Sequence, residues 1–307
     1  MIICVGEILA DMIAKKTDEG VYFGRYAGGA PFNVACGIAK LGGASGFYGC
    51  VGKDLIGEFL VDFAMKQPLS YCNIIRSKER NTTLAFVELN NEGDRKFCFY
   101  RKHTADYHLR EKDIEEIVEK ADIVHLGSLP MSESNGRKFY DKLISYAREK
   151  GKKISFDVNY RDDIFPDEEV AKEIYLKYIA AADIVKLSQE ELLLFTAETD
   201  ILSGMEKLAQ DSDKVVFVTL GSGGSAYFYK GHFERTSALP VQVKDTTGAG
   251  DAFFAGVLSE IDKHGFDDLK TALLTGSICG SLTTQKKGAI DAFPTKDEVE
   301  KCRTEII

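Results

Sequence analysis

A glycine-rich bend at residues 245–254, DTTGAGDAFF, carries the residues best suited to chemistry. The apolar residues after it recur at helical spacing, which predicts that the bend runs onto the first turn of an amphipathic helix. At such a helix start the backbone N–H groups lack intrahelical partners, and the macrodipole favours negative charge. We expect three small residues to present their amides to a phosphate as an anion hole: Gly248, Ala249 and Gly250.

Asp251 lies next to this anion hole, where a carboxylate does nothing to hold a phosphate. One task for it is to accept the proton of a hydroxyl group that attacks the phosphate, as a general base. The alternative is a first-turn aspartate that caps the helix or complements its dipole. Taken alone, the residues of the bend support both interpretations equally.

Predicted strands that end in polar or glycine residues surround this bend. Residues 239–244 alternate apolar and polar side chains, which predicts a short strand ending at Asp245, and Asp11 follows a buried strand at 2–5. Open α/β sheets bind ligands at the carboxyl ends of their strands, so we expect such polar residues to converge there. Other strands run into polar or glycine residues at 157–161, 186–191 and 219–224.

Two glycine-rich stretches have more than one interpretation. The turn at 27–43 precedes a second predicted helix, in whose first turn the Asn33 amide suits a polyol hydroxyl or, equally, a capping role. The glycines of 219–224 suit the close approach of a nucleotide to the backbone, or a hairpin turn. The rest of the chain must decide between these interpretations.

From residue 107 onward, predicted strands and helices alternate, which indicates a parallel sheet with helices packed on it. Earlier in the chain, strands at 82–89 and 96–100, joined by turn residues 90–94, predict a hairpin that projects from the main sheet. No repeat, low-complexity tract or linker divides the sequence. The pattern predicts one α/β domain over residues 1–307.

Composition excludes several classes of function. The 307 residues are 44% hydrophobic and 28% charged, which is typical of a globular protein with a substantial core. A net charge of −9 and a pI near 5.2 argue against nucleic-acid binding, which needs a basic face. The sequence shows neither a signal peptide nor an apolar run long enough to span a membrane, so we expect a cytoplasmic protein. Seven scattered cysteines, none in a C-x-x-C pair, indicate free core thiols.

Two nucleotide-binding motifs fail to match. Phe47 stands where a P-loop needs its first glycine, and Asp54 stands where it needs Ser or Thr for magnesium. The glycines at 221–224 and 248–250 do not keep the G-x-G-x-x-G spacing of a dinucleotide fold. An NAD-dependent oxidoreductase is therefore disfavoured.

Two of the glycine-rich stretches described above give the chain a resemblance to the ribokinase-like (PfkB) sugar kinases over essentially its whole length. Residues 27–35, AGGAPFNVA, resemble the family's sugar-binding motif, and 245–253 resemble its anion-hole motif. One departure is Ser188, where many members have Asn; it leaves Glu191 as the better candidate for a phosphate or magnesium contact. Within the family the chain is most similar to fructokinases, through the segments at 29–33, 95–106, 157–161 and 186–191.

The resemblance implies a fold and a set of site residues. The fold is a three-layer α/β/α arrangement with a mostly parallel central sheet and a small β lid, formed by segments near 12–26 and 82–101. The sugar lies against Asp11, Gly28, Gly29, Asn33, Arg101, Asn159 and Arg161. ATP lies along Lys186, Glu191, Thr219, Gly221 and Gly224, and Glu191 reaches Mg²⁺ through water. A monovalent cation such as K⁺ is bound by Asp245 and Thr247, beside the loop at 283–289.

The expected reaction is transfer of the ATP γ-phosphoryl group to a primary hydroxyl of a sugar, with O6 of D-fructose as the expected acceptor. In this hypothesis Asp251 is the base and the amides of 248–250 stabilise the transferring phosphoryl group. A 2-keto-3-deoxygluconate kinase, which Arg101 and Arg161 would suit, and a ribokinase-type kinase remain alternatives, as does a sensor that binds without turnover. Homodimerisation through the lid is a further expectation from the family.

Overall fold

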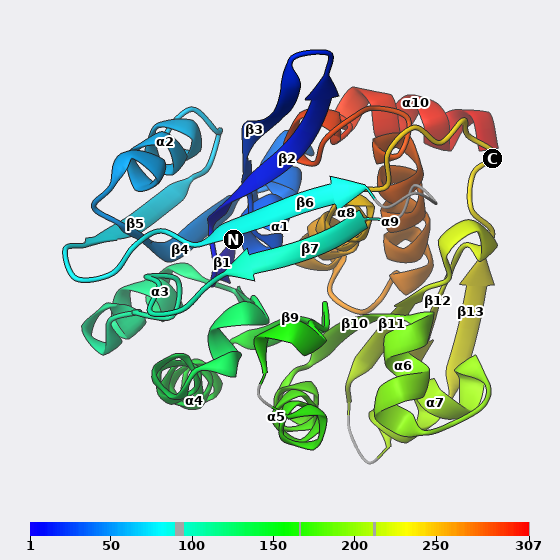
Figure 1. Cartoon of the computed structure of the whole chain (residues 1–307). Helices are drawn as coiled ribbons and strands as arrows, with labels where there is room; N and C mark the ends of the chain where they lie inside the picture. The colour runs from blue at the N-terminus through cyan, green and yellow to red at the C-terminus, as the bar shows by residue number, and fades with distance from the viewer. Residues whose placement is uncertain (90–94, 166, 211–212, 307) are drawn as a thin grey trace.

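A nine-stranded sheet forms the centre of the computed structural model, which describes residues 1–89, 95–165, 167–210 and 213–306 (Figure 1). Its strand order is β13-β12-β11-β10-β9-β8-β1-β4-β5. All neighbours from β11 to β5 pair in parallel, whereas β12 and β13 are antiparallel, which confirms the predicted mostly parallel sheet. The bounds are β1 Ile2–Val5, β4 Ser45–Gly52, β5 Tyr71–Ser77, β8 Ile123–Leu126, β9 Lys153–Asp157, β10 Ile184–Ser188, β11 Val215–Thr219, β12 Ser225–Tyr229 and β13 His232–Thr236.

Helices cover both faces of this sheet because its strands are apolar on both sides. In β1, Ile2 and Cys4 pack into one apolar core, and Ile3 and Val5 into the other. The first core is shared with α1 Ala30–Lys40, α2 Leu55–Ala64, α8 Ala249–His264, α9 Leu269–Thr283 and α10 Lys296–Ile306. The second is shared with α3 Ile114–Lys120, α4 Ser134–Glu149, α5 Glu168–Ala181, α6 Gln189–Thr196 and α7 Ile201–Ala209. The predicted three-layer α/β/α fold is confirmed.

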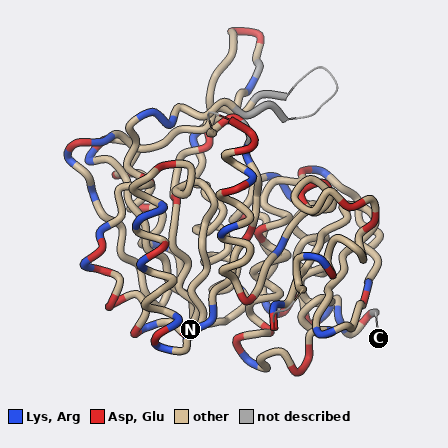
Figure 2. Tube along the Cα trace, turned by 90° about the horizontal axis from the view of Figure 1, so that it is seen from below, with Lys and Arg blue, Asp and Glu red and all other residues tan. Residues whose placement is uncertain are grey.

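A separate four-stranded sheet, β3-β2-β6-β7, lies at the edge of the main body. Its strands are β2 Leu9–Thr17, β3 Gly20–Gly28, β6 Leu84–Leu89 and β7 Arg95–Tyr100. The β2–β3 and β6–β7 pairs are antiparallel, β2 pairs with β6 in parallel, and the β2–β3 hairpin projects from the body (Figures 1 and 2). The strands of the small sheet fall at the segments predicted for the lid, while the predicted turn at 90–94 lies outside the described residues.

The predicted strand at 239–244 is wrong. This segment joins neither sheet. Leu239 N–H donates to Ser281 Oγ at 3.3 Å, and the Lys244 and Asp245 N–H groups donate to Thr284 O at 2.8 and 3.1 Å. Pro240 has no N–H group to offer a strand ladder. The segment therefore follows the C-terminal end of α9 instead of joining a sheet.

Lys and Arg residues are interspersed with Asp and Glu along the trace (Figure 2). Among the described residues, no helix combines the length and apolar character needed to cross a membrane.

Candidate active site

The bend at the start of α8 requires glycine at position 248. Gly248 has φ +73°, in the left-handed region, and a Cβ there would lie 2.8 Å from Ala289 Cβ. α8 begins at Ala249, so its first-turn amides have no intrahelical acceptor. The Ala249 N–H donates to Thr246 O at 3.2 Å within the bend, which leaves the amides of Gly248 and Gly250 as the better-placed anion donors.

Two pockets meet at this bend. The polar pocket, a cavity of about 290 Å³, is lined by Glu7, Leu9, Asp11, Gly29, Ala30, Asn33, Phe99, Leu129, Asn159, Arg161, Lys186, Thr246, Thr247, Gly248, Gly250 and Asp251. The apolar pocket, of about 620 Å³, is lined by Thr219, Gly221, Ser222, Gly224, Ser225, Ala238, Leu239, Pro240, Val241, Val243, Thr246, Ala249, Gly250, Phe253, Ser277, Gly280, Ser281 and Thr284. Thr246 and Gly250 line both pockets, so the bend forms the boundary between them.

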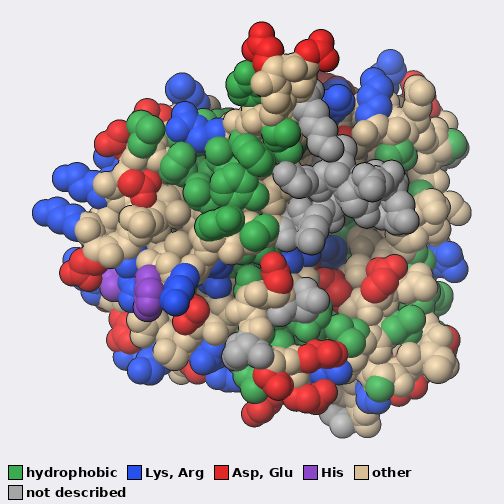
Figure 3. Space-filling view, viewed as in Figure 1, with side chains coloured by type: hydrophobic (Ala, Val, Ile, Leu, Met, Phe, Trp, Pro, Cys, Tyr) green, Lys and Arg blue, Asp and Glu red, His purple; other side chains and the backbone are tan. Residues whose placement is uncertain are grey.

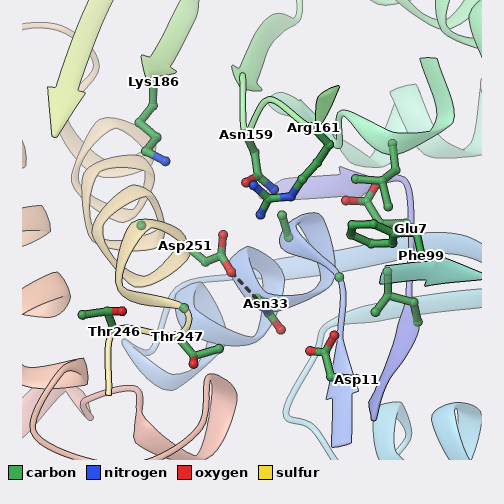
Figure 4. Close-up of a pocket in the computed structure, with 16 residues that line it drawn as sticks. Glu7, Asp11, Asn33, Phe99, Asn159, Arg161, Lys186, Thr246, Thr247 and Asp251 are labelled. Carbon is green, nitrogen blue, oxygen red and sulfur yellow. Dashed lines mark hydrogen bonds between the residues drawn. The ribbon is translucent and has the colours of Figure 1, made fainter. Parts of the chain in front are cut away.

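Asp251 lies at this boundary and is held by a residue from the other predicted glycine motif. The Asn33 Nδ2 group, on α1, donates to Asp251 Oδ2 at 2.8 Å (Figure 4). Within the described chain, the Asp251 carboxylate takes its hydrogen bond from this side chain, and not from an amide of its own helix. The predicted capping role is therefore not the one adopted. Burial raises the pKa of Asp251, an effect opposed by Asn33, Lys186 and Arg161.

Lys186 approaches the bend from the end of β10 and is neutralised by a buried partner. Its Nζ lies 3.0 and 3.2 Å from the two oxygens of Asp157, which ends β9. Burial raises the pKa of Asp157 to about 7, although Lys186 opposes the shift. A Cβ on Gly250 would lie 3.0 Å from Lys186 Nζ, so glycine at this position allows the ammonium group to approach the helix start.

The remaining walls of the polar pocket come from chain segments that are far apart in the sequence (Figure 4). Asp11 on β2 occupies the space where Gly28 would carry a Cβ, which explains the glycine at 28. Asn159, after β9, has φ +36°, a strained conformation for a residue other than glycine. Arg161 donates to Tyr160 O at 3.2 Å and borders the pocket. The structure therefore brings Asp11, Asn159 and Arg161 to one cavity, as the sequence predicts.

Arg101 does not line either pocket. Its guanidinium group lies 2.6 Å from Asp106 Oδ2 and donates to Leu129 O at 2.7 Å, and both charged side chains are buried. Its charge is thus neutralised inside the protein. The arginine fixes the backbone of Leu129, which does line the polar pocket.

Glu191 is held by backbone amides. It forms a capping box with Ser188 at the start of α6: Ser188 N–H donates to Glu191 Oε2 at 2.7 Å. Tyr160 N–H donates to its other oxygen at 2.6 Å. Glu191 lines neither pocket, but its charge contributes to raising the pKa values of Asp157 and Lys186. Its contact with magnesium through water stays a prediction.

The Asp245 side chain links the bend to the loop at 283–289, which the resemblance to the family places beside it. Its Oδ1 accepts from Thr247 N–H at 2.9 Å and from Thr247 Oγ1 at 2.6 Å, and its Oδ2 accepts from Gly288 N–H at 2.9 Å. Among the described residues, no cluster of three or more His, Cys, Asp or Glu side chains forms a metal site. A monovalent cation at Asp245 and Thr247 stays a prediction.

The apolar pocket contains three of the five residues predicted to lie along a nucleotide, Thr219, Gly221 and Gly224, while Lys186 lines the polar pocket and Glu191 lines neither. Gly221–Gly223 forms the turn of the antiparallel β11–β12 pair, so the hairpin interpretation is also correct. Gly224 has φ +98°, and a Cβ there would collide with Thr236 O.

Sequence reasoning missed most of the apolar pocket and part of the polar one. The wall at 238–243 and the α9 residues Ser277, Gly280 and Ser281 carry no chemical signal, because they act through shape. Glu7, Phe99, Leu129 and Thr246 were also missed as pocket residues. The signal for Glu7 was its place just beyond the first strand, two residues after Val5, at the sheet edge that also pointed to Asp11.

Comparison with known proteins agrees with this architecture. The model of the pfkB family carbohydrate kinases matches residues 1–296. The chain is 36% identical over 312 residues to a probable fructokinase-6, chloroplastic, of Arabidopsis thaliana, covering 98% of this chain and 81% of that protein.

Two solved structures are also similar over nearly their whole length. The Xylella fastidiosa fructokinase with bound ATP has a TM-score of 0.90 and 31% identity, covering 99% of this chain and 98% of the other. The Vibrio cholerae O395 fructokinase, in its fructose, ADP and calcium ion bound form, has a TM-score of 0.89 and 29% identity, covering 98% and 97%. The chain belongs to the pfkB family of carbohydrate kinases and is an ATP-dependent sugar kinase.

Proposed function

We propose that this kinase transfers the γ-phosphoryl group of ATP to O6 of D-fructose. The observation that carries the proposal is the place of Asp251: in the first turn of α8, it lines the polar pocket directly after Gly250, which lines both pockets. A sugar in the polar pocket and a nucleotide in the apolar pocket would meet at this point. The three similar proteins described above are named as fructokinases or as a probable fructokinase, which supports fructose as the acceptor.

Phosphoryl transfer depends mainly on positioning and charge stabilisation. Asp251 accepts the proton of the attacking hydroxyl, and Asn33 keeps its carboxylate in place. The raised pKa of Asp251 makes it a stronger base than an exposed aspartate. The amides of Gly248 and Gly250, with the Lys186 ammonium near them, stabilise charge on the transferring group.

The chain also offers places for the ions that such a reaction uses. Mg²⁺, when bound with ATP, neutralises phosphate charge and keeps most of its waters. The Glu191 carboxylate is fixed by two backbone amides, so it suits an outer contact through water and not direct ligation. Asp245 and Thr247, joined to the loop at Gly288, would hold K⁺ beside the anion hole.

The charges around the polar pocket favour a neutral sugar over a sugar acid. A 2-keto-3-deoxygluconate kinase needs an uncompensated cation for the substrate carboxylate. Arg101 is paired with Asp106 outside the pocket, which leaves Arg161 as the remaining predicted arginine at the wall. Asp11 and Asp251 add negative charge to the same cavity.

The small sheet is proposed to act as a lid and a dimer contact. Phe99, from β7, lines the polar pocket, so movement of this sheet would change access to the sugar and exclude water during transfer.

Hydrophobic side chains gather over this sheet (Figure 3), and Val21, Tyr22, Phe23 and Tyr26 on β3 are exposed. Sedimentation equilibrium tests the dimer, and a monomer at micromolar concentration would contradict it.

A substrate panel tests the function. Purified protein, ATP and Mg²⁺ are mixed with fructose, ribose, 2-keto-3-deoxygluconate, glucose and no sugar, and ADP is measured through a coupled assay. We expect the highest kcat/KM with fructose, and the product is identified as the 6-phosphate by NMR. Turnover confined to 2-keto-3-deoxygluconate or ribose would replace fructose, and sugar binding without ADP release would indicate a sensor.

A further inference from the structure

Glu7 is a buried acid that lacks a partner inside the protein. It lies two residues after the end of β1 and has no exposed surface. Among the described residues, neither of its carboxyl oxygens has a hydrogen-bond partner. Removing a carboxyl group from water without replacing its hydrogen bonds is costly, so such a group in a native fold needs an explanation.

The fold reserves space for this carboxyl group at the border of the polar pocket. A Cβ on Gly127 would collide with Glu7 Oε2, so glycine at 127 leaves room for the carboxyl group. Glu7 lines the pocket and lies at its Arg161 and Phe99 end, away from Lys186 and Thr246 (Figure 4). Because Glu7 borders this cavity and its carboxyl oxygens are covered, a small shift of the cavity wall on sugar binding would bring a hydroxyl group to them.

The surroundings of Glu7 suit a neutral hydroxyl. Burial raises the pKa of Glu7 to about 8; the nearby backbone N–H of Glu7 itself and Arg101 act against the rise, and Asp106 and Asp251 add to it. Its charge in turn contributes to raising the pKa of Tyr140. At neutral pH the carboxyl group is mainly protonated, so it offers both a donor and an acceptor. A substrate carboxylate beside it would meet further acids and lose hydration.

Glu260 is another buried glutamate, and its contacts are those of a structural residue. Glu260, on α8, is 6% exposed, and its Oε1 lies 3.2 Å from Arg303 Nη2 and 3.3 Å from Lys263 Nζ. It lines neither pocket and joins α8 to α10. Glu260 therefore has its partners within the fold, whereas Glu7 has none among the described residues.

We propose that Glu7 is a substrate-binding residue, whose carboxyl group exchanges a hydrogen bond with a hydroxyl of the acceptor sugar remote from the one phosphorylated. The proposal rests on the function proposed above and extends it: Glu7 helps to restrict the pocket to neutral polyols. A site built to pair with a hydroxyl strongly rejects an analogue that lacks it, because the buried group then stays unpaired.

The test compares Glu7→Leu with Glu7→Gln. Leucine has a similar size but no polar group, so we expect KM for fructose to rise about tenfold or more, with KM for ATP within about twofold of wild type. The amide of Glu7→Gln keeps a donor and an acceptor, so its fructose KM should stay within about threefold at pH 7. Because Glu7 has no protein partner to lose, Tm of Glu7→Leu should stay the same or rise.

Glu260→Leu is the matched control, since it removes a buried glutamate that does have partners. We expect a lower Tm and an unchanged fructose KM. An unchanged fructose KM in Glu7→Leu would overturn the proposal and indicate that water alone satisfies the carboxyl group. A lower Tm in Glu7→Leu, with KM unchanged, would make Glu7 structural.

Deoxy analogues keep the proposal testable if Glu7→Leu folds poorly. Fructose analogues that each lack one hydroxyl are assayed with wild type and with Glu7→Asp, whose shorter side chain retracts the carboxyl group. One analogue should have the same KM with both proteins, because the hydroxyl that pairs with Glu7 is gone; an equal loss with every analogue would overturn the pairing.

The substrate panel is read first, so that the two proposals can fail separately. If wild type phosphorylates another sugar, the choice of fructose fails, and the Glu7 variants are measured with that sugar. If fructose is turned over normally while the Glu7 variants leave its KM unchanged, the inference fails and the function stands.

Discussion

The polar and apolar pockets meet at one bend but are built from different materials. Side chains from β2, α1, the ends of β9 and β10 and the start of α8 form the polar pocket, so charge and hydrogen bonds dominate it. The apolar pocket is formed by glycines, small residues and aliphatic side chains from three stretches, near 219–225, 238–253 and 277–284. If the proposed assignment holds, chemistry and sugar selection depend on single groups of the polar pocket, whereas nucleotide binding depends on a shape that many residues of the apolar pocket share.

Asp251→Asn should have the largest effect, and it tests whether the chemistry depends on one side chain of the polar pocket. The substitution keeps the size of the side chain and an oxygen that can accept from Asn33, but removes the base. We expect kcat to fall at least about 100-fold, with both KM values changed little. Steady-state assays with coupled ADP detection measure it, and an unchanged Tm shows that the fold is intact. Near-normal kcat in a folded variant would remove Asp251 from the mechanism.

Gly248→Ala tests the bend shared by the two pockets. A Cβ at this positive-φ position would press on Ala289 and Phe293, so the start of α8 must shift. We expect kcat to fall about tenfold, because displacement of an anion hole by a fraction of an ångström weakens transition-state contacts.

Gly265→Ala is the control for backbone strain alone. Gly265 ends the same helix with φ +62°, and a Cβ there meets nothing within 4 Å. It should lower Tm without changing kcat. If both variants lower kcat equally, strain in α8, and not the position of the bend, determines the loss.

Much of the polar pocket could be predicted because its residues have polar or charged side chains and lie at helix starts or strand ends, where α/β sheets bind ligands. Asp251 and Asn33 lie in glycine-rich helix starts, and Asn159 follows a strand end. Arg101 was placed in the pocket because its type suits a ligand, whereas its pairing with Asp106 depends on how the chain folds after β7. Glu7 is the reverse case: it was not expected in the pocket, because only the packed structure shows that its carboxyl group lacks hydrogen-bond partners among the described residues.

The apolar pocket shows why the rest could not be predicted. The pattern at 239–244 predicts a strand, yet the segment joins no sheet, and the consecutive residues 239–241 all line the cavity. The small residues of α9 that line this cavity are typical of any close helix packing. A pattern of apolar and small residues specifies that a surface is covered, but does not specify by what.

Val241→Ala tests whether the apolar pocket acts through distributed contacts. Losing two methyl groups at its wall should raise KM for ATP about three- to fivefold and leave kcat and the fructose KM unchanged. Val170→Ala, on the exposed part of α5, is the control and should change neither KM. A larger rise in the fructose KM than in the ATP KM would contradict the assignment of the two pockets.

The smallest expected effect concerns the dependence of Tm on pH. Titratable residues of the polar pocket should change this dependence, whereas residues of the apolar pocket should not. The folded protein holds the Glu7 proton up to a pKa of about 8, whereas the unfolded chain releases it near 4.5. Between these values the folded state binds more protons, so stability falls as pH rises from about 4.5 to 8 and levels off above that. Asp157, with a pKa raised to about 7, adds to the same fall.

Glu7→Gln should make this fall shallower, because it removes one of the two contributions and leaves that of Asp157 in place. Arg101, Asp106 and Asp251, the charged groups around Glu7, are unchanged in the variant. Differential scanning calorimetry between pH 5 and 8.5 measures the slope. Val241→Ala, which alters only the apolar pocket, should give a curve parallel to wild type. Parallel curves for Glu7→Gln and wild type would mean that Glu7 ionises normally in the folded protein, and that the polar pocket carries one more negative charge at neutral pH than its burial implies.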